Sequence, residues 1–157
     1  MVKTQLEIIL EELGRTTLIA MSSLRPNDKN TCLIPLPDGM KIQVEMDKYE
    51  KNLIIGCVLG DIEPGHYRNS LFQAALIANG LPHPRYGVLA YGNKTNKLVL
   101  HDTLSMHELN GEKVAEYLGF FLEKARTWKQ AIEGGNVPHI SAAYGSQGTV
   151  SVFGLKL

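Results

Sequence analysis

The chain has little cysteine, no excess of either charge and no long hydrophobic run. Only two of its 157 residues are cysteines, Cys32 and Cys57, which is too few for a disulfide framework. Sixteen basic and sixteen acidic side chains cancel, which argues against a surface that binds nucleic acid. No apolar stretch approaches the ~20 residues of a membrane-spanning helix, and Glu7, Glu11 and Glu12 interrupt any signal-peptide pattern. We therefore expect a cytoplasmic protein with no membrane span and no nucleic-acid partner.

Catalytic and metal-binding motifs are also missing. The histidines show no His-Glu-x-x-His spacing, no serine stands in a Gly-x-Ser-x-Gly frame, and residues 60–65 lack the Lys-Ser/Thr ending of a phosphate-binding loop. His101 and Asp102 are neighbours on a predicted strand and therefore point to opposite faces. We predict no catalytic residue, no metal site and no cofactor. The alternatives are a small hydrolase that uses His101, Asp102 or Cys32, and a regulatory domain that binds a ligand or a folded partner.

The clearest element is a long helix between Asn110 and Gly135. Asn110 is a favoured N-terminal cap, and Gly134-Gly135 followed by Pro138 is a typical helix end. The apolar residues between them recur at the spacing of one helix face: Val114, Leu118, Phe121, Leu122, Ala125, Trp128 and Ile132. Burying the larger of these side chains would contribute roughly 10–15 kcal/mol as an upper value. With 44% hydrophobic residues in the whole chain, we expect this helix to close one core.

Three strands are predicted between residues 31 and 59. The first, 31–36, ends at Pro37-Asp38-Gly39, which is typical of a hairpin, and residues 40–47 alternate apolar and polar side chains. The third, 53–59, is apolar on both faces. Leu53, Ile55, Cys57 and Leu59 point one way, whereas Ile54 and Val58 point the other. An uncovered apolar face would be sticky, so a helix, a second copy or a partner chain should cover it.

The remaining elements complete an α-β-β-β-α-β-β-α order. A helix over residues 2–14 precedes the three strands, a helix over 67–79 follows them, and a hairpin of 86–92 and 97–103 leads into the long helix. No β-α-β repeat is required by this order. We therefore predict an α+β fold with a twisted, mainly antiparallel sheet over residues 1–133.

The helix predicted over 67–79 is apolar around most of its circumference. Its apolar residues are Leu71, Phe72, Ala74, Ala75, Leu76, Ile77 and Ala78. Such a helix is buried on most sides, either as a central core helix or as a subunit interface, and we favour the interface of a homodimer.

Residues 134–157 form a Gly/Ser-containing C-terminal extension outside this pattern. Val150, Val152 and Phe153 could form a short strand there, but we favour a flexible extension.

Two blocks of residues follow a pattern known from one protein family. The first block consists of Leu59-Gly60, Arg68, Leu71, Leu76 and Asn79. The second consists of Leu109, Leu118, Phe121, Ala125, Trp128 and Ile132. Asp38-Gly39 followed by alternating Ile42, Val44 and Glu45 also fits. In order and spacing, over about residues 2–133, the chain resembles the class I type III secretion chaperones, the Tir-chaperone (CesT-like) family of Gram-negative bacteria.

The resemblance implies a homodimeric, non-enzymatic chaperone in the bacterial cytoplasm. It would bind the N-terminal region of one or more effector proteins in extended form and keep them soluble and secretion-competent. The secretion-system ATPase or sorting components are further candidate partners. The expected effector-binding residues are Leu6, Ile9, Leu10, Leu33, Ile54 and Val58. The expected dimer-interface residues are Leu71, Phe72, Ala75, Leu76, Tyr86 and Val88.

Overall fold

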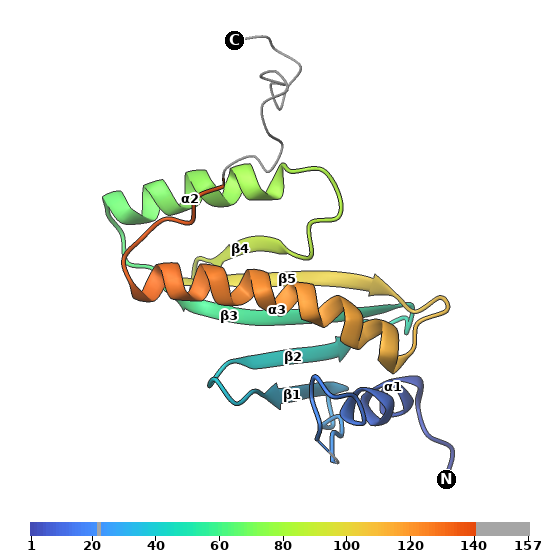
Figure 1. Cartoon of the computed structure of the whole chain (residues 1–157). Helices are drawn as coiled ribbons and strands as arrows, with labels where there is room; N and C mark the ends of the chain where they lie inside the picture. The colour runs from blue at the N-terminus through green and yellow to red at the C-terminus, as the bar shows by residue number, and fades with distance from the viewer. Residues whose placement is uncertain (22, 141–157) are drawn as a thin grey trace.

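The computed structural model describes residues 1–21 and 23–140 of the chain. Its elements follow the predicted order (Figure 1): α1 (Gln5–Gly14), β1 (Thr31–Pro35), β2 (Lys41–Met46), β3 (Asn52–Asp61), α2 (His66–Asn79), β4 (Val88–Gly92), β5 (Lys97–Ser105) and α3 (Gly111–Glu133). The strand suggested at Val150, Val152 and Phe153 lies outside the described residues.

The strands form one sheet in the order β1-β2-β3-β5-β4, and every neighbouring pair is antiparallel. This arrangement confirms the predicted α+β fold class. The first three strands form a meander, and β5 then inserts beside β3, which leaves β4 at the edge. Helix α2 connects the centre of the sheet to this edge and packs against β4.

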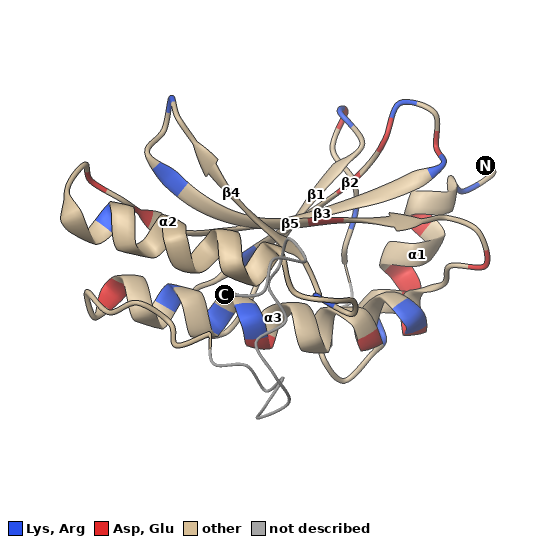
Figure 2. Ribbon diagram, turned by 90° about the horizontal axis from the view of Figure 1, so that it is seen from above, with Lys and Arg blue, Asp and Glu red and all other residues tan. Residues whose placement is uncertain are grey.

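Helices α1 and α3 lie on the same side of the sheet, as the view in Figure 2 shows. Helix α3 packs against β3 and against α1. The predicted apolar stripe of α3 is buried at Val114, Leu118, Phe121, Leu122, Ala125 and Trp128, and Ile132 is half-buried. The core therefore lies between this helical layer and one face of the sheet.

Side-chain caps set where α1 and α3 begin. The Thr4 hydroxyl accepts a hydrogen bond from the Glu7 N–H (3.2 Å), and the Glu7 carboxylate accepts one from the Thr4 N–H (2.7 Å). Because of this capping box, α1 begins at Gln5 and not at residue 2 as predicted. Asn110 caps α3 as predicted, accepting from the Lys113 N–H at 2.9 Å. Strand β4 begins later than predicted, because Tyr86 has a φ of +52° that an extended strand does not allow.

Both cysteines are free and buried, Cys32 on β1 and Cys57 on β3, with β2 between them. Burial raises the pKa of both thiols, that of Cys57 to about 11. Among the described residues, no helix is both long enough and apolar enough to cross a membrane.

On each edge strand of the sheet, an asparagine forms hydrogen bonds with the backbone N–H and C=O groups of one strand residue. On β4, the Asn79 amide donates to the Leu89 carbonyl and accepts from the Leu89 N–H, both at 2.9 Å. On β1, the Asn27 side chain accepts from the Thr31 N–H (3.1 Å), and the Asn27 N–H donates to the Thr31 carbonyl (2.8 Å). Pro35 at the end of β1 has no N–H to offer. These contacts occupy the outward backbone groups at one position of each edge strand, Leu89 on β4 and Thr31 on β1.

Asn79→Asp is expected to lower the free energy of unfolding by about 1–3 kcal/mol. The carboxylate still accepts from the Leu89 N–H, but it cannot donate to the Leu89 carbonyl, and it places a negative charge at the C-terminal end of α2. Asn27→Asp is the matched control, because the Asn27 side chain only accepts hydrogen bonds, from Lys29 and Thr31. Urea denaturation followed by circular dichroism compares the variants. Equal midpoints for the two would show that the Asn79 contact does not hold α2 on β4.

Candidate functional site

The face of the sheet opposite the α1–α3 layer carries exposed apolar side chains. On β3, Leu53, Ile55, Cys57 and Leu59 are buried against the helices, as the alternation predicted. Val58 on the other face is 53% exposed, Leu33 on β1 is 55% exposed, and Ile54 is half-buried. Among the described residues, no helix packs on this face, which we call the outer face. Three of the predicted effector-binding residues thus lie on one open surface.

A cleft of about 480 Å³ opens on the outer face. It is lined by Leu33, Gly39, Met40, Lys41, Gln43, Glu45, Ile54, Ile55, Gly56, Cys57, Val58, Val99, Leu100, His101 and Lys129. Gly56 lies at its centre, in register with Gln43 on β2 and His101 on β5. A Cβ atom built on Gly56 would meet no atom within 4 Å, so the missing side chain leaves a hollow in the surface.

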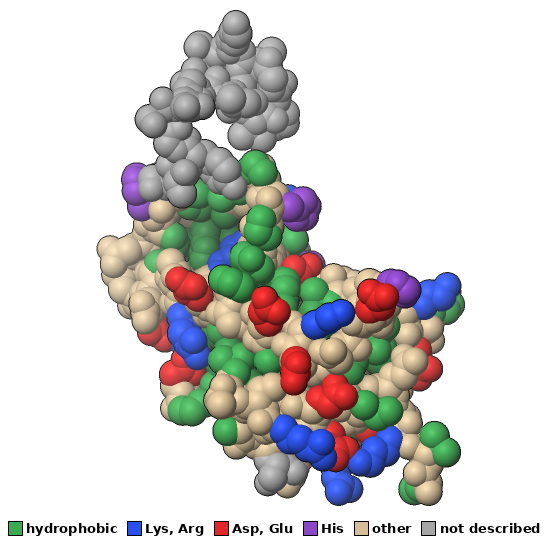
Figure 3. Space-filling view, turned by 45° about the vertical axis from the view of Figure 1, so that its right-hand side comes forward, with side chains coloured by type: hydrophobic (Ala, Val, Ile, Leu, Met, Phe, Trp, Pro, Cys, Tyr) green, Lys and Arg blue, Asp and Glu red, His purple; other side chains and the backbone are tan. Residues whose placement is uncertain are grey.

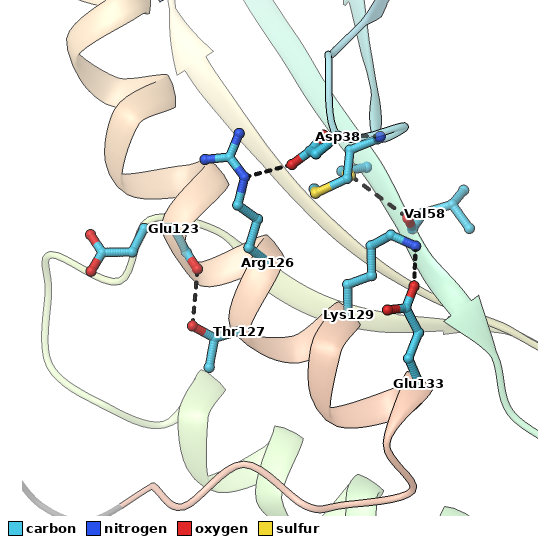
Figure 4. A network of polar contacts seen from close by, with 9 residues as sticks. Asp38, Val58, Glu123, Arg126, Thr127, Lys129 and Glu133 are labelled. Atoms are coloured by element: carbon cyan, nitrogen blue, oxygen red, sulfur yellow. Dashed lines mark hydrogen bonds and ion pairs between the residues drawn. The ribbon is translucent and has the colours of Figure 1, made fainter.

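Charged side chains from α3 reach one end of this cleft. Lys129 lines it and pairs with Glu133 at 2.7 Å, and the Arg126 Nε contacts the Asp38 carboxylate in the β1–β2 turn at 2.7 Å (Figure 4). The hydrogen bonds from Arg126 and from the Met40 N–H hold the pKa of Asp38 below its usual value. The cleft therefore combines apolar side chains of β1, β3 and β5 with the polar side chains of β2 and an ion-paired end, which suits a segment that mixes apolar and polar residues.

The residues of the hydrolase alternative do not come together. Asp102 is in register with Ile55, Val44 and Cys32 across the sheet, three strand spacings or about 14 Å from Cys32. The Tyr117 hydroxyl of α3 donates to the Asp102 carboxylate, whereas His101 is exposed on the outer face. No group of acidic, histidine or cysteine residues in the described part could hold a metal ion. The described geometry thus contains no nucleophile paired with a base among these residues.

Three predicted effector-binding residues on α1 lie in the interior. Leu6, Ile9 and Leu10 are buried in the common core, where α1 packs against α3. They follow the same helical spacing as Leu13, so they form the core-facing stripe of the helix. Helix α1 instead exposes Ile8, which falls between stripe positions and was not among the predicted residues.

Helix α2 is buried on one side only. Leu71 and Ala75, two of the predicted interface residues, are buried within the chain, together with Ala74 and Ala78. On the other side Leu76 is 72% exposed and Ile77 is 51% exposed. Ile77 was not among the predicted dimer-interface residues. Figure 3 shows hydrophobic side chains exposed in the upper part of the molecule, at the height of α2 in Figure 1.

The other predicted interface residues are half-buried, two of them by aromatic contacts. The Phe72 ring packs edge-on against Tyr91, with centroids 4.9 Å apart. Tyr86 stacks on Phe120 of α3 at 4.5 Å, and Val88 is half-buried at the start of β4. These three residues are therefore only partly accessible to a second copy.

Three solved structures resemble this fold. One is described as the structure of the HopA1-SchA chaperone-effector complex, with a TM-score of 0.63, 17% identity, and coverage of 78% of this chain and 91% of that chain. A second is the type III secretion chaperone SycH of Yersinia pestis in complex with a stable fragment of YscM2. Its TM-score is 0.57 and its sequence identity 17%, and the match covers 76% of this chain and 96% of that chain. A third is the ExsC-ExsE complex, with a TM-score of 0.60, 15% identity, and coverage of 87% of this chain and 95% of that chain. At these identities the likeness shows a shared fold.

The sequence itself matches a family model over most of its length. No curated protein matches the chain. The model of the Tir chaperone protein (CesT) family, however, matches residues 8–129, which include every helix and strand of the structure except the first turn of α1 and the end of α3. The chain therefore belongs to the Tir chaperone protein (CesT) family.

Proposed function

We propose that this protein is a type III secretion chaperone whose outer face holds the N-terminal region of an effector protein in extended form. The observation that carries the proposal is the open cleft around Gly56, bordered by the apolar side chains of Leu33, Ile54 and Val58. Family membership and the solved chaperone structures with the same fold support it. Shielding the apolar segment would keep the effector soluble and secretion-competent in the bacterial cytoplasm, and delivery would involve the secretion-system ATPase or sorting components.

The effector segment is proposed to bind through its side chains on the outer face more than through its backbone at a sheet edge. An added strand needs a row of free N–H and C=O groups. Asn79 occupies those of Leu89 on β4, and Asn27 occupies those of Thr31 on β1. The hollow at Gly56 offers a place where one apolar side chain of the segment could be seated.

The working unit is proposed to be a homodimer joined through the exposed side of α2. Leu76 and Ile77 form an apolar pair that water contacts in the single chain. A second copy related by a two-fold axis would place the same residues opposite one another and exclude that water. Two outer faces would then be available to one extended effector segment.

Val58→Asp is expected to reduce effector capture at least tenfold while folding persists, because Val58 is half exposed and a charge there opposes an apolar ligand. The chain is tagged and purified from its own bacterium, and the bound protein is identified and treated with protease. We expect one dominant secreted protein, protected near its N-terminus. Tyr49→Asp, at an exposed position in the β2–β3 turn outside the cleft, is the matched control.

Gly56→Val separates shape from hydrophobicity at the same site. The new side chain meets open space and suits a strand, so the variant should fold, yet it fills the hollow and should reduce capture. Undiminished capture by both Val58→Asp and Gly56→Val would reject the outer face as the effector site.

A further inference from the structure

We infer that the outer-face cleft selects effector segments that carry an acidic and a basic side chain four residues apart, with a large apolar side chain midway between them. The inference rests on the proposed function, because it names the class of sequence that the same cleft would bind. It is carried by three outward positions of β2, Lys41, Gln43 and Glu45, and by the hollow at Gly56.

Strand β2 presents a row of polar side chains to the outer face. Ile42 and Val44 are buried in the core. The alternating residues Lys41, Gln43 and Glu45 therefore point outward, and all three line the cleft. Glu45 follows Lys41 by four residues, so their Cα atoms are about 13 Å apart along the strand. One basic and one acidic group thus mark the two ends of the same row.

The register aligns this row with the hollow. Gln43 is opposite Gly56, and Glu45 is opposite Ile54 on β3. Lys41 lies on the other side of the hollow from Glu45, at a similar distance along β2. An extended segment that follows β2 advances by the same ~3.3 Å per residue as the strand. When one of its side chains is seated in the hollow, the side chains two positions before and after it therefore lie close to Lys41 and Glu45.

Both charges are available to a ligand. None of the ion pairs among the described residues involves Lys41 or Glu45. The Glu45 Oε2 accepts hydrogen bonds from the Gln43 amide (3.2 Å) and the Thr31 hydroxyl (3.4 Å), which hold the carboxylate on the outer face. No residue of the described part donates to its Oε1. A basic side chain of a ligand can therefore lay its methylene groups on Ile54 and place its charge at this carboxylate.

The two charges exclude segments of a single sign. Side-chain contacts allow the bound segment to run in either direction along β2, so the acidic residue can come before or after the basic one. A segment with two acidic residues would place one of them at Glu45 in either direction, and a segment with two basic residues would place one at Lys41. Like charges brought together in this way oppose binding.

The test compares three fluorescent nine-residue peptides on the purified full chain by fluorescence anisotropy. The mixed peptide is Thr-Val-Glu-Thr-Leu-Thr-Lys-Val-Thr, the acidic peptide has glutamate at both charged positions, and the basic peptide has lysine at both. The mixed peptide should bind about fivefold more tightly than either of the others. The difference should shrink at 1 M salt, where the Debye length is ~3 Å.

Two substitutions should change which peptide binds most tightly. Lys41→Glu should favour the basic peptide, and Glu45→Lys should favour the acidic peptide, each by about fivefold over the mixed one. Misfolding cannot produce such a change of preference, because it would weaken the binding of all three peptides. Lys94→Glu, at an exposed position in the β4–β5 turn outside the cleft, is the matched control and should keep the preference for the mixed peptide.

A fourth peptide of the same composition tests the spacing. In Thr-Val-Thr-Glu-Leu-Lys-Thr-Val-Thr the charged side chains point to the opposite face from the leucine, so this peptide should lose the advantage of the mixed one. The inference would be overturned if no peptide bound, or if one ranking of the peptides held for the parent chain, Lys41→Glu and Glu45→Lys. Effector capture is measured separately with Val58→Asp, so its loss in that variant would leave the proposed function standing after such a result.

Discussion

Gly111→Ala is expected to lower the free energy of unfolding by about 3 kcal/mol, since extra atoms in a packed site typically cost ~1–3 kcal/mol and here the neighbour is backbone. Gly111 begins α3 where α1 ends. A Cβ at this position would stand 2.3 Å from the Glu12 Cβ and 2.6 Å from the Leu13 nitrogen. The Gly111 N–H also donates to the Glu12 carboxylate at 2.7 Å. Separating the helices to relieve the clash would break this hydrogen bond and loosen the packing of Leu10 and Leu13.

Gly119→Ala is the matched control, in the same helix and with the same added methyl group. A Cβ at Gly119 meets no atom within 4 Å, and alanine is the better helix former by up to ~1 kcal/mol, so this variant should be more stable than the parent chain. Thermal unfolding followed by circular dichroism measures both. With ~2–4 °C per kcal/mol at this chain length, we expect the two melting temperatures to move in opposite directions. A Gly111→Ala chain that melts with the parent would contradict the close α1–α3 contact.

Leu76→Glu is expected to convert the proposed homodimer into monomers without unfolding the subunit. The side chain is 72% exposed in the single chain, so a glutamate there remains in water when the subunits are apart. In the dimer the same charge would be buried without a partner, which costs ~3–5 kcal/mol per site, a loss of more than a hundredfold in the dimer affinity. Light scattering at micromolar concentration should change from twice 17.4 kDa to 17.4 kDa.

Ile8→Glu is the control for the dimer experiment. Ile8 is also a large exposed apolar residue on a helix, but it lies on α1, away from the proposed interface. This variant should stay dimeric. A Leu76→Glu chain that elutes and scatters like the parent would remove α2 from the interface, and a parent chain of 17.4 kDa under these conditions would reject the dimer itself.

The order of the elements could be predicted from the sequence because it depends on neighbouring residues. Asn110 caps α3 through an amide hydrogen bond three residues away, and the apolar stripe that follows needs only the helical period to be recognised. In the same way the alternation along β3 separated buried Ile55 from outward Ile54 and Val58. The family resemblance also came from such local blocks, and the family match confirms it.

Helix periodicity could not show which apolar residues are available to a partner. In α2 the small side chains of Ala74, Ala75 and Ala78 are buried, whereas the large Leu76 is exposed. Size and hydrophobicity would suggest the reverse. On α1 the predicted binding residues Leu6, Ile9 and Leu10 are core residues, because α3 packs over the stripe they form. A stripe of apolar residues identifies a buried face, but not the surface that buries it.

The sequence by itself determined the elements, their order and the face of each strand, since caps, turns and side-chain alternation act over a few residues. Only the tertiary structure decided the cleft and the protected edges. The strand register places Gly56 between Gln43 and His101, so its missing side chain leaves a hollow in the outer face. Asn79 reaches Leu89 because α2 packs against β4. These contacts join strands and helices that are distant along the chain, so their partners are set by packing of the whole domain and not by local propensity.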